Sequence, residues 1–181
     1  NFIVNYHPET INKIKNKKNI SEILSALKKF KDCYFIFTMP GADLGNSVII
    51  KKIKKYIKKH KNVYFFKSLG QQNYISLLRH IDGMIGNSSS GILEMPYFNK
   101  GTVNLGDRQK GRLMSKSIIN SKIKKNLIIK AVQKLQSKNF RNKIRKNNYL
   151  YGKPGAPIKI VNILKKITLN NLIRKKFYDI I

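Results

Sequence analysis

Short apolar runs alternate with longer segments of helical periodicity along this 181-residue chain. The predicted strands cover residues 2–6, 33–37, 63–66, 83–86, 102–105 and 117–119. The predicted helices cover residues 19–31, 48–59, 74–79, 91–97, 123–137, 140–147, 157–167 and 168–181. Strands that alternate with helices form a parallel sheet with helices on both faces. This order predicts one Rossmann-like α/β domain over residues 1–167, followed by a C-terminal helix over residues 168–181.

Local signals refine the first of these elements. Apolar residues recur at helical spacing between residues 19 and 31, and Asn19 and Glu22 fit a capping pair at the start of that helix. The run from Cys33 to Phe37 is apolar at every position. An unbroken run of this length is typical of a strand that is buried on both faces.

The chain is strongly basic, with 38 Lys and Arg residues against 8 Asp and Glu residues and a formal net charge of +30. One interpretation is a nucleic-acid or anionic-membrane partner, and the other is a general bias toward Lys, Asn and Ile. The lysines are spread over several predicted helices without a known nucleic-acid-binding motif, which favours the bias. We therefore expect no nucleic-acid and no membrane partner, although the charge will attract an anionic substrate.

Length and composition limit the class of protein further. With 181 residues, 41% of them hydrophobic, the chain builds one domain with a core, and its apolar runs are too short to span a membrane. The single cysteine, Cys33, has no partner for an internal disulfide, and no His or Cys cluster indicates a metal site. Because the chain has no signal peptide and begins with Asn1, not Met, directly before a strand, we interpret it as the C-terminal part of a longer protein. The lone cysteine suits the reducing cytoplasm, where we expect the protein to be located.

The run Gly86-Asn87-Ser88-Ser89-Ser90-Gly91-Ile92-Leu93-Glu94 stands between a predicted strand and a predicted helix. Serine and asparagine often cap helices, but one cap needs only one side chain. Three hydroxyls between two glycines instead favour a phosphate-binding turn, because the N–H groups at a helix N-terminus attract anions. The run is neither a P-loop nor a dinucleotide-binding fingerprint.

Three polar groups follow three different predicted strands. His7 follows the first strand, the serine run follows the fourth, and Asp107 and Arg108 follow the fifth. Open parallel sheets bind ligands at the carboxyl ends of their strands. We therefore expect the three groups to meet at one edge of the sheet.

These side chains are suited to more than one role. His7 can donate a hydrogen bond to phosphate or act as an acid or base. Glu94 either interacts with the helix dipole or accepts hydrogen bonds from vicinal ribose hydroxyls. Arg108 is placed to clamp a diphosphate, with Arg112 as a second cation.

Three motifs of the chain resemble those of the hydrolysing UDP-N-acetylglucosamine 2-epimerases. They are Asn5-Tyr6-His7-Pro8-Glu9-Thr10, Gly86-Asn87-Ser88-Ser89-Ser90-Gly91, and Val103-Asn104-Leu105-Gly106-Asp107-Arg108-Gln109-x-Gly111-Arg112. Tyr151-Gly152 resembles the closing turn of the family, so the similarity covers nearly the whole chain. The family has a two-domain, glycosyltransferase-B-like fold. This chain is similar to its C-terminal, nucleotide-binding half, which implies that the N-terminal domain is absent here.

The resemblance implies roles for particular residues. His7 and Arg108 would contact the diphosphate together with the serine run, and Glu94 would hold the ribose. The loop at Ser68 and Leu69 would face uracil through its backbone. The full set of expected UDP-binding residues is His7, Ser68, Leu69, Ser88, Ser89, Ser90, Gly91, Glu94, Arg108 and Arg112, with His7 also the catalytic candidate.

The reaction implied by the resemblance is anti elimination of UDP from UDP-N-acetylglucosamine, which gives a 2-acetamidoglucal. Water then adds with inversion at C2 and releases N-acetylmannosamine for sialic-acid-type sugars. Neither a cofactor nor a metal is required. The acid and base carboxylates of the family lie mostly in its other half, so this chain alone should bind nucleotide without turnover. The full enzyme is expected to form a homo-oligomer.

Two positions depart from the family pattern. Leu113 stands where glutamate is frequent, and Lys153-Pro154 stands where Asp-Gly is usual. These changes leave the sugar open, and a UDP-linked 2,4-diacetamido sugar is an alternative substrate. The nucleotide-binding half of a glycosyltransferase is a second alternative, and a nucleic-acid-binding module driven by charge is a third.

Overall fold

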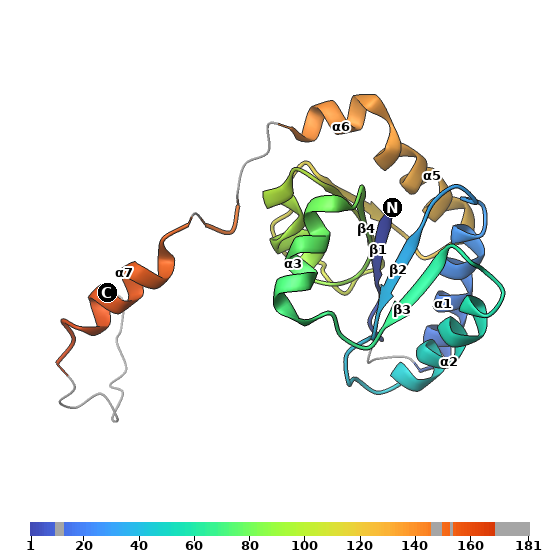
Figure 1. The fold of residues 1–181 in the computed structure, drawn as a ribbon, viewed down its shortest axis with the longest axis horizontal. Helices are drawn as coiled ribbons and strands as arrows, with labels where there is room; N and C mark the ends of the chain where they lie inside the picture. The colour runs from blue at the N-terminus through green and yellow to red at the C-terminus, as the bar shows by residue number, and fades with distance from the viewer. Residues whose placement is uncertain (10–12, 146–149, 153, 169–181) are drawn as a thin grey trace. The chain divides into compact units, whose positions relative to one another are not determined.

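The computed structural model describes residues 1–9, 13–145, 150–152 and 154–168, and its centre is a parallel sheet (Figure 1). In this described part, six strands form the sheet: β1 (Phe2–Asn5), β2 (Phe35–Thr38), β3 (Val63–Phe66), β4 (Gly83–Gly86), β5 (Gly101–Leu105) and β6 (Ile118–Ser121). Their order is β3-β2-β1-β4-β5-β6, and all neighbouring pairs are parallel. The chain reverses its direction of winding between β1 and β4, which is where sheets of this kind open a ligand crevice.

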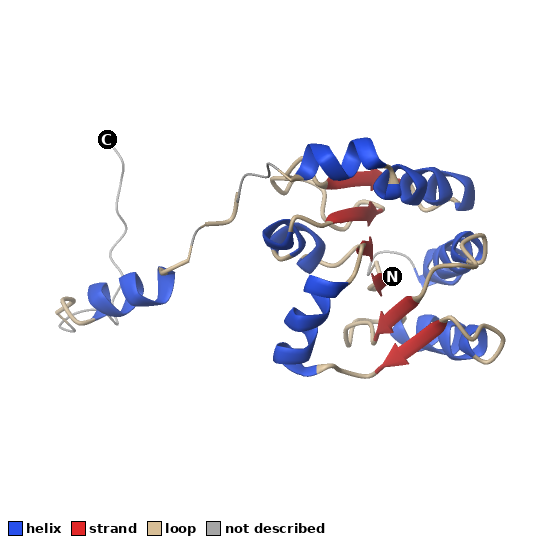
Figure 2. Cartoon of the chain, turned by 45° about the horizontal axis from the view of Figure 1, so that its top comes forward, coloured by secondary structure: helices blue, strands red, loops and turns tan. Residues whose placement is uncertain are grey.

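Helices cover both faces of the sheet (Figure 2). On one face α1 (Lys13–Leu27) lies between α2 (Asn46–Ile57) and α5 (Lys125–Gln136), and α6 (Lys138–Ile144) follows α5. On the other face lie α3 (Gly70–His80), α4 (Ser90–Leu93) and the 3-10 helix η1 (Met95–Phe98). The predicted Rossmann-like fold, a parallel sheet covered on both faces, is confirmed.

Two apolar clusters join the sheet to these helix layers. Because successive side chains of a strand point to opposite faces, Val4 belongs to the cluster under α1, α2 and α5, whereas Ile3 belongs to the cluster under α3. In β4, Ile85 belongs to the first of these clusters and Met84 to the second. Each such fully buried side chain stabilises the fold by about 1.5–3 kcal/mol. The sheet is thereby a rigid platform for the loops at its carboxyl edge.

The prediction for the first helix is wrong at its start. α1 begins at Lys13, so Asn19 lies inside the helix, where its Nδ2 donates a hydrogen bond to the hydroxyl of Tyr6 at 3.1 Å. Glu22 does not cap α1 either. Its Oε2 accepts a hydrogen bond of 2.6 Å from the backbone N of Lys125, at the start of α5. Both polar residues serve contacts between elements that the local pattern does not reveal.

The second strand also differs from its prediction. β2 is shifted to Phe35–Thr38 and alternates between buried and half-buried residues, because its second face is only partly covered. The other helices expected within the described residues are present, with ends displaced by a few residues. The helix predicted over residues 91–97 is divided into α4 and η1 at Glu94.

β1 and β4 approach each other closely at their carboxyl ends. Gly86 has a φ angle of +150°, and a Cβ atom there would lie only 1.9 Å from the backbone oxygen of Asn5. The backbone N of Asn87 donates a hydrogen bond of 3.0 Å to that same oxygen. Glycine is required for such a contact because it has no Cβ atom. The segments that follow β1 and β4 are therefore neighbours.

The chain divides into two compact units, Asn1–Leu150 and Tyr151–Ile181. The second unit contains α7 (Ala156–Leu164), and the helix predicted over residues 168–181 lies, beyond Thr168, outside the described residues. Large apolar side chains of α7 are exposed: Ile158, Ile160, Val161, Ile163 and Leu164. None of the helices that the structure describes combines the length and the apolar composition that a membrane crossing requires.

Candidate functional site

The carboxyl ends of β1, β4 and β5 bring three of the predicted groups together. His7 follows β1, the serine run follows β4, and Arg108 follows β5. Nη1 of Arg108 donates a hydrogen bond of 3.3 Å to the backbone oxygen of Asn87, the residue before Ser88. The same Asn87 contacts His7 through its side chain. A histidine, an arginine and the serine run therefore share one edge of the sheet, at its switch point.

Asn87 is the residue that connects these groups. Its side chain is fully buried, its Oδ1 accepts a hydrogen bond from His7 N at 2.7 Å, and its Nδ2 donates to His7 O at 2.9 Å. Its backbone oxygen accepts from Arg108 and also from Nε2 of the buried Gln109, at 2.8 Å. A hydrogen bond of this kind stabilises a fold by about 0.5–1.5 kcal/mol. The bonds of Asn87 thus hold the His7 segment and the Arg108 loop in one arrangement, a role that sequence reasoning did not assign.

The ring of His7 is held in its neutral form. The backbone N–H of Gly41 donates a hydrogen bond of 2.9 Å to Nδ1, so the neutral ring carries its proton on Nε2. Burial lowers the pKa of His7 below its ordinary value of 6.5; the charge of Arg108 lowers it further, and Asp43 opposes both effects. His7 is therefore suited to donate a hydrogen bond from Nε2 rather than to accept a proton there.

The serine run presents backbone donors. α4 has only four residues, so its dipole is small and the local N–H groups matter more. The amides of Ser90 and Gly91 donate to Ser88, at 3.3 Å to Oγ and at 3.2 Å to O. Within the described residues, the amides of Ser88 and Ser89 donate no hydrogen bond. Because backbone N–H groups normally find an acceptor, these two are available to an anion.

The hydroxyl of Ser90 is engaged inside the protein. It donates to Oε2 of Glu94 and lies 2.6 Å from the hydroxyl of Tyr74. Nδ2 of Asn5, the last residue of β1, donates to that tyrosine hydroxyl at 2.8 Å. Glu94 is thus fixed beside the serine run. Asn5 was detectable in principle, because it ends a strand at the ligand edge, whereas Tyr74 looks like an ordinary helix residue.

The other predicted residues are placed differently. Arg112 is exposed, and among the described residues its side chain has no hydrogen-bond or ion-pair partner. Ser68 is exposed and Leu69 is half-buried in the turn between β3 and α3, where Ser68 Oγ accepts a hydrogen bond of 3.2 Å from Gly70 N. Gly91 is buried against Thr102. No side chain of these residues joins the hydrogen bonds around Asn87, although the backbone amide of Arg112 donates to Gln109 O at 3.3 Å.

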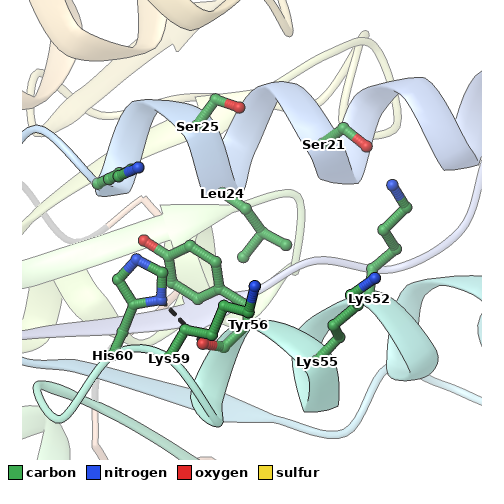
Figure 3. A pocket seen from close by; sticks show the side chains of 9 residues that line it. Ser21, Leu24, Ser25, Lys52, Lys55, Tyr56, Lys59 and His60 are labelled. Atoms are coloured by element: carbon green, nitrogen blue, oxygen red, sulfur yellow. Dashed lines mark hydrogen bonds between the residues drawn. The ribbon is translucent and has the colours of Figure 1, made fainter.

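The described residues offer no group of three His, Cys, Asp or Glu side chains that could hold a metal ion. A hollow of about 300 Å³ lies instead between α1 and α2, where the rings of Tyr56 and His60 stack with centroids 3.7 Å apart (Figure 3). Its lining includes Lys28, Lys52, Lys55 and Lys59. None of the predicted site residues lines it, so the hollow is not part of the candidate site.

Comparison with known proteins connects this geometry to a family. The family model described as "UDP-N-acetylglucosamine 2-epimerase" matches residues 1–165. The chain belongs to this epimerase family. The resemblance seen in the three sequence motifs is therefore confirmed.

Two curated relatives match 99% of this chain. The "Polysialic acid biosynthesis protein P7" of Escherichia coli is 37% identical, and the "GDP/UDP-N,N'-diacetylbacillosamine 2-epimerase (hydrolyzing)" of Campylobacter jejuni is 39% identical. The matches cover 46% and 47% of these relatives, so the chain spans about half of their length.

A solved structure shows the same fold. The UDP-GlcNAc 2-epimerase of Neisseria meningitidis, bound to UDP-GlcNAc, superposes with a TM-score of 0.74 over 92% of this chain and 45% of that protein. The sequence identity is 19%. The epimerase-family fold therefore extends over nearly all of the chain.

Proposed function

We propose that this chain is the C-terminal, nucleotide-binding half of a hydrolysing UDP-sugar 2-epimerase. The observation that carries the proposal is that the amides of Ser88 and Ser89, which donate no hydrogen bond to any residue that the structure describes, lie at the same sheet edge as the ring of His7 and the guanidinium of Arg108. Backbone amides, a ring N–H and an arginine together form a suitable set of donors for a diphosphate. Membership in the epimerase family supports a UDP-sugar as the ligand that contains this diphosphate.

The same donors have a chemical function in the proposed reaction. Elimination breaks the bond between C1 of the sugar and the diphosphate oxygen, while a proton leaves C2 and the electron pair forms the glycal double bond. Negative charge grows on the departing diphosphate. Fixed donors stabilise this charge more in the transition state than in the ground state, which raises the rate. We expect the carboxylates that transfer the protons to lie in the other half of the enzyme, which this chain does not include.

The sugar that we propose is N-acetylglucosamine, released as N-acetylmannosamine for sialic-acid-type sugars. The relative named for polysialic acid biosynthesis supports this choice. The relative named for diacetylbacillosamine supports a UDP-linked 2,4-diacetamido sugar as the alternative. Product analysis of the protein that contains this chain, supplied with each UDP-sugar in turn, separates the two.

Calorimetric titration of the purified chain with UDP tests the nucleotide site directly. Ser89→Pro removes one amide donor, and the φ angle of −62° at Ser89 already suits proline. Ser89→Ala is the matched control because it keeps the amide. We expect UDP to bind at about 0.15 M salt, where surface charges are screened beyond about 8 Å. Ser89→Pro should weaken binding about tenfold, and Ser89→Ala much less.

Uridine provides a second test that needs no variant. Because it lacks the diphosphate, it should bind at least about tenfold more weakly than UDP. Equal affinity for uridine and UDP would contradict the phosphate site. Absence of UDP binding, together with tight binding of mixed-sequence DNA, would overturn the proposal in favour of a nucleic-acid-binding module.

A further inference from the structure

Four side-chain hydrogen bonds link the carboxyl ends of two strands to Glu94. Oγ1 of Thr38, the last residue of β2, donates to Oδ1 of Asn5 at 2.5 Å. Nδ2 of Asn5 donates to the hydroxyl of Tyr74 on α3 at 2.8 Å. This hydroxyl lies 2.6 Å from Oγ of Ser90, which donates to the carboxylate of Glu94. The side chains in this series come from β2, β1, α3 and α4, so the hydrogen bonds connect four separate elements.

The direction of every bond in this series is determined. The hydrogen of Ser90 Oγ goes to the Glu94 carboxylate, so the hydroxyl of Tyr74 must donate to Ser90. Asn5 supplies the hydrogen that the Tyr74 oxygen accepts, and Thr38 supplies the hydrogen that Asn5 Oδ1 accepts. All donors therefore point along one line toward the negative charge. Aligned hydrogen bonds polarise one another, which strengthens the last bond to the carboxylate.

We infer that Tyr74 is a positioning residue that, through Ser90, orients Glu94 toward the vicinal hydroxyls of a ribose and so makes the site selective for ribonucleotides over 2′-deoxyribonucleotides. This inference rests on the proposed function, because it assumes that a nucleotide binds here and explains the selectivity for its ribose. Ser90 uses one oxygen of the carboxylate. The second oxygen is the acceptor that the ribose needs.

The environment of Tyr74 supports a lasting donor role. Burial is the main cause that raises the pKa of Tyr74 above its ordinary value of 10.0, and the Glu94 charge adds to it, so the hydroxyl stays protonated at neutral pH. Glu94 itself is half-buried at the end of α4, where a carboxylate without a donor would turn toward water. The Tyr74–Ser90 pair supplies this donor. Selectivity for ribose then depends on a residue that does not touch the ligand.

The test is a cycle of two proteins and two ligands. Wild-type chain and Tyr74→Phe are each titrated by calorimetry with UDP and with 2′-deoxyuridine 5′-diphosphate. Phenylalanine keeps the ring and removes only the hydroxyl. We expect the wild type to favour UDP by about tenfold, and Tyr74→Phe to reduce that preference to about twofold, by weakening UDP and leaving the deoxy ligand unchanged.

Tyr6→Phe is the matched control. Tyr6 is also buried, and its hydroxyl accepts a hydrogen bond of 3.1 Å from Asn19 on α1, on the other face of the sheet. This variant should lose stability to a similar extent and keep the full preference for UDP. Ser90→Ala, which interrupts the same series, should behave like Tyr74→Phe.

The outcomes separate the inference from the proposed function. If wild type binds UDP and the deoxy ligand equally well, or if Tyr74→Phe weakens both ligands by the same factor, the inference is overturned and the nucleotide site stands. If wild type binds neither ligand, the proposed function fails. A loss of preference confined to Tyr74→Phe and Ser90→Ala supports the inference.

Discussion

At the scale of single residues, the site depends on which polar atoms carry a hydrogen and can donate it, and which can only accept one. His7 is the clearest case, because its sequence context allows an acid, a base or a simple donor. The Gly41 amide resolves this choice by occupying Nδ1. Sequence reasoning selected His7, Ser88 and Arg108 from their places after strands, and the structure brings them to one edge of the sheet. The same reasoning did not find Asn87, Gln109 or Tyr74, whose roles arise from contacts made only after the chain has folded.

His7→Asn tests the neutral ring. Asparagine Oδ1 can take the place of Nδ1 as acceptor for Gly41, but it neither titrates nor reproduces the Nε2 donor. Because folding lowers the pKa of His7 below 6.5, the unfolded state binds the proton first as the pH falls. The wild type therefore loses stability as the pH falls through and below 6.5. Above pH 6.5 the ring is neutral in both states, and His7 causes no such loss.

We expect His7→Asn to remove that part of the pH dependence and to weaken UDP binding about tenfold. Urea unfolding at pH 7.5 and at pH 5.5, for both proteins, measures the first effect, and calorimetry measures the second. An identical loss of stability between the two pH values in both proteins would show that His7 does not titrate in this way.

At the scale of elements, the ends of β1 and β4 are joined twice, by the Gly86 contact with Asn5 and by the side chain of Asn87. Periodicity predicted the strands and helices well, because buried faces impose it on the sequence. It misplaced the start of α1, since Asn19 and Glu22 belong to contacts with Tyr6 and α5 rather than to a cap. Polar residues in the interior therefore mark where one element meets another, and no local pattern identifies their partners.

Asn87→Ala should separate the two strand ends. It removes both side-chain bonds to His7, so the free energy of unfolding should fall by about 2 kcal/mol, and the affinity for UDP should fall at least about tenfold. Asn104→Ala is the matched control. Asn104 is 2% exposed on β5, and its side chain donates to Asn120, at 2.8 Å.

Asn104→Ala should lower the free energy of unfolding by about 1 kcal/mol and leave UDP affinity unchanged. Urea unfolding and calorimetry on the same samples give both quantities. Wild-type affinity in Asn87→Ala would mean that the strand ends keep their arrangement without this side chain.

At the scale of the whole molecule, charge is the dominant feature. The formal net charge is +30, while the described residues contain three ion pairs: the N-terminus with Asp82, Lys15 with Glu9 and Arg141 with Asp82. Most lysines therefore repel one another at the surface. This repulsion favours the expanded, unfolded chain over the compact one.

Salt should stabilise the chain for this reason. Raising NaCl from 0.01 M to 0.1 M shortens the screening length from about 30 Å to about 10 Å, so the melting temperature should rise by several degrees. Differential scanning calorimetry measures the change, with sucrose at equal osmolality as the control for solute exclusion. A melting temperature that is unchanged or lower in salt would show that the positive charges are compensated within the fold.

The bond between His7 and Asn87 also says something about the order of events in folding. It joins residues 80 positions apart, and the neighbouring pair β1–β4 is parallel and equally remote in sequence. Closing loops of this size is slow, so such contacts are late to form. The groups that we propose as donors for a diphosphate are thus assembled only when the sheet is nearly complete. A nucleotide bound to them would lengthen the lifetime of the folded chain without hastening its formation.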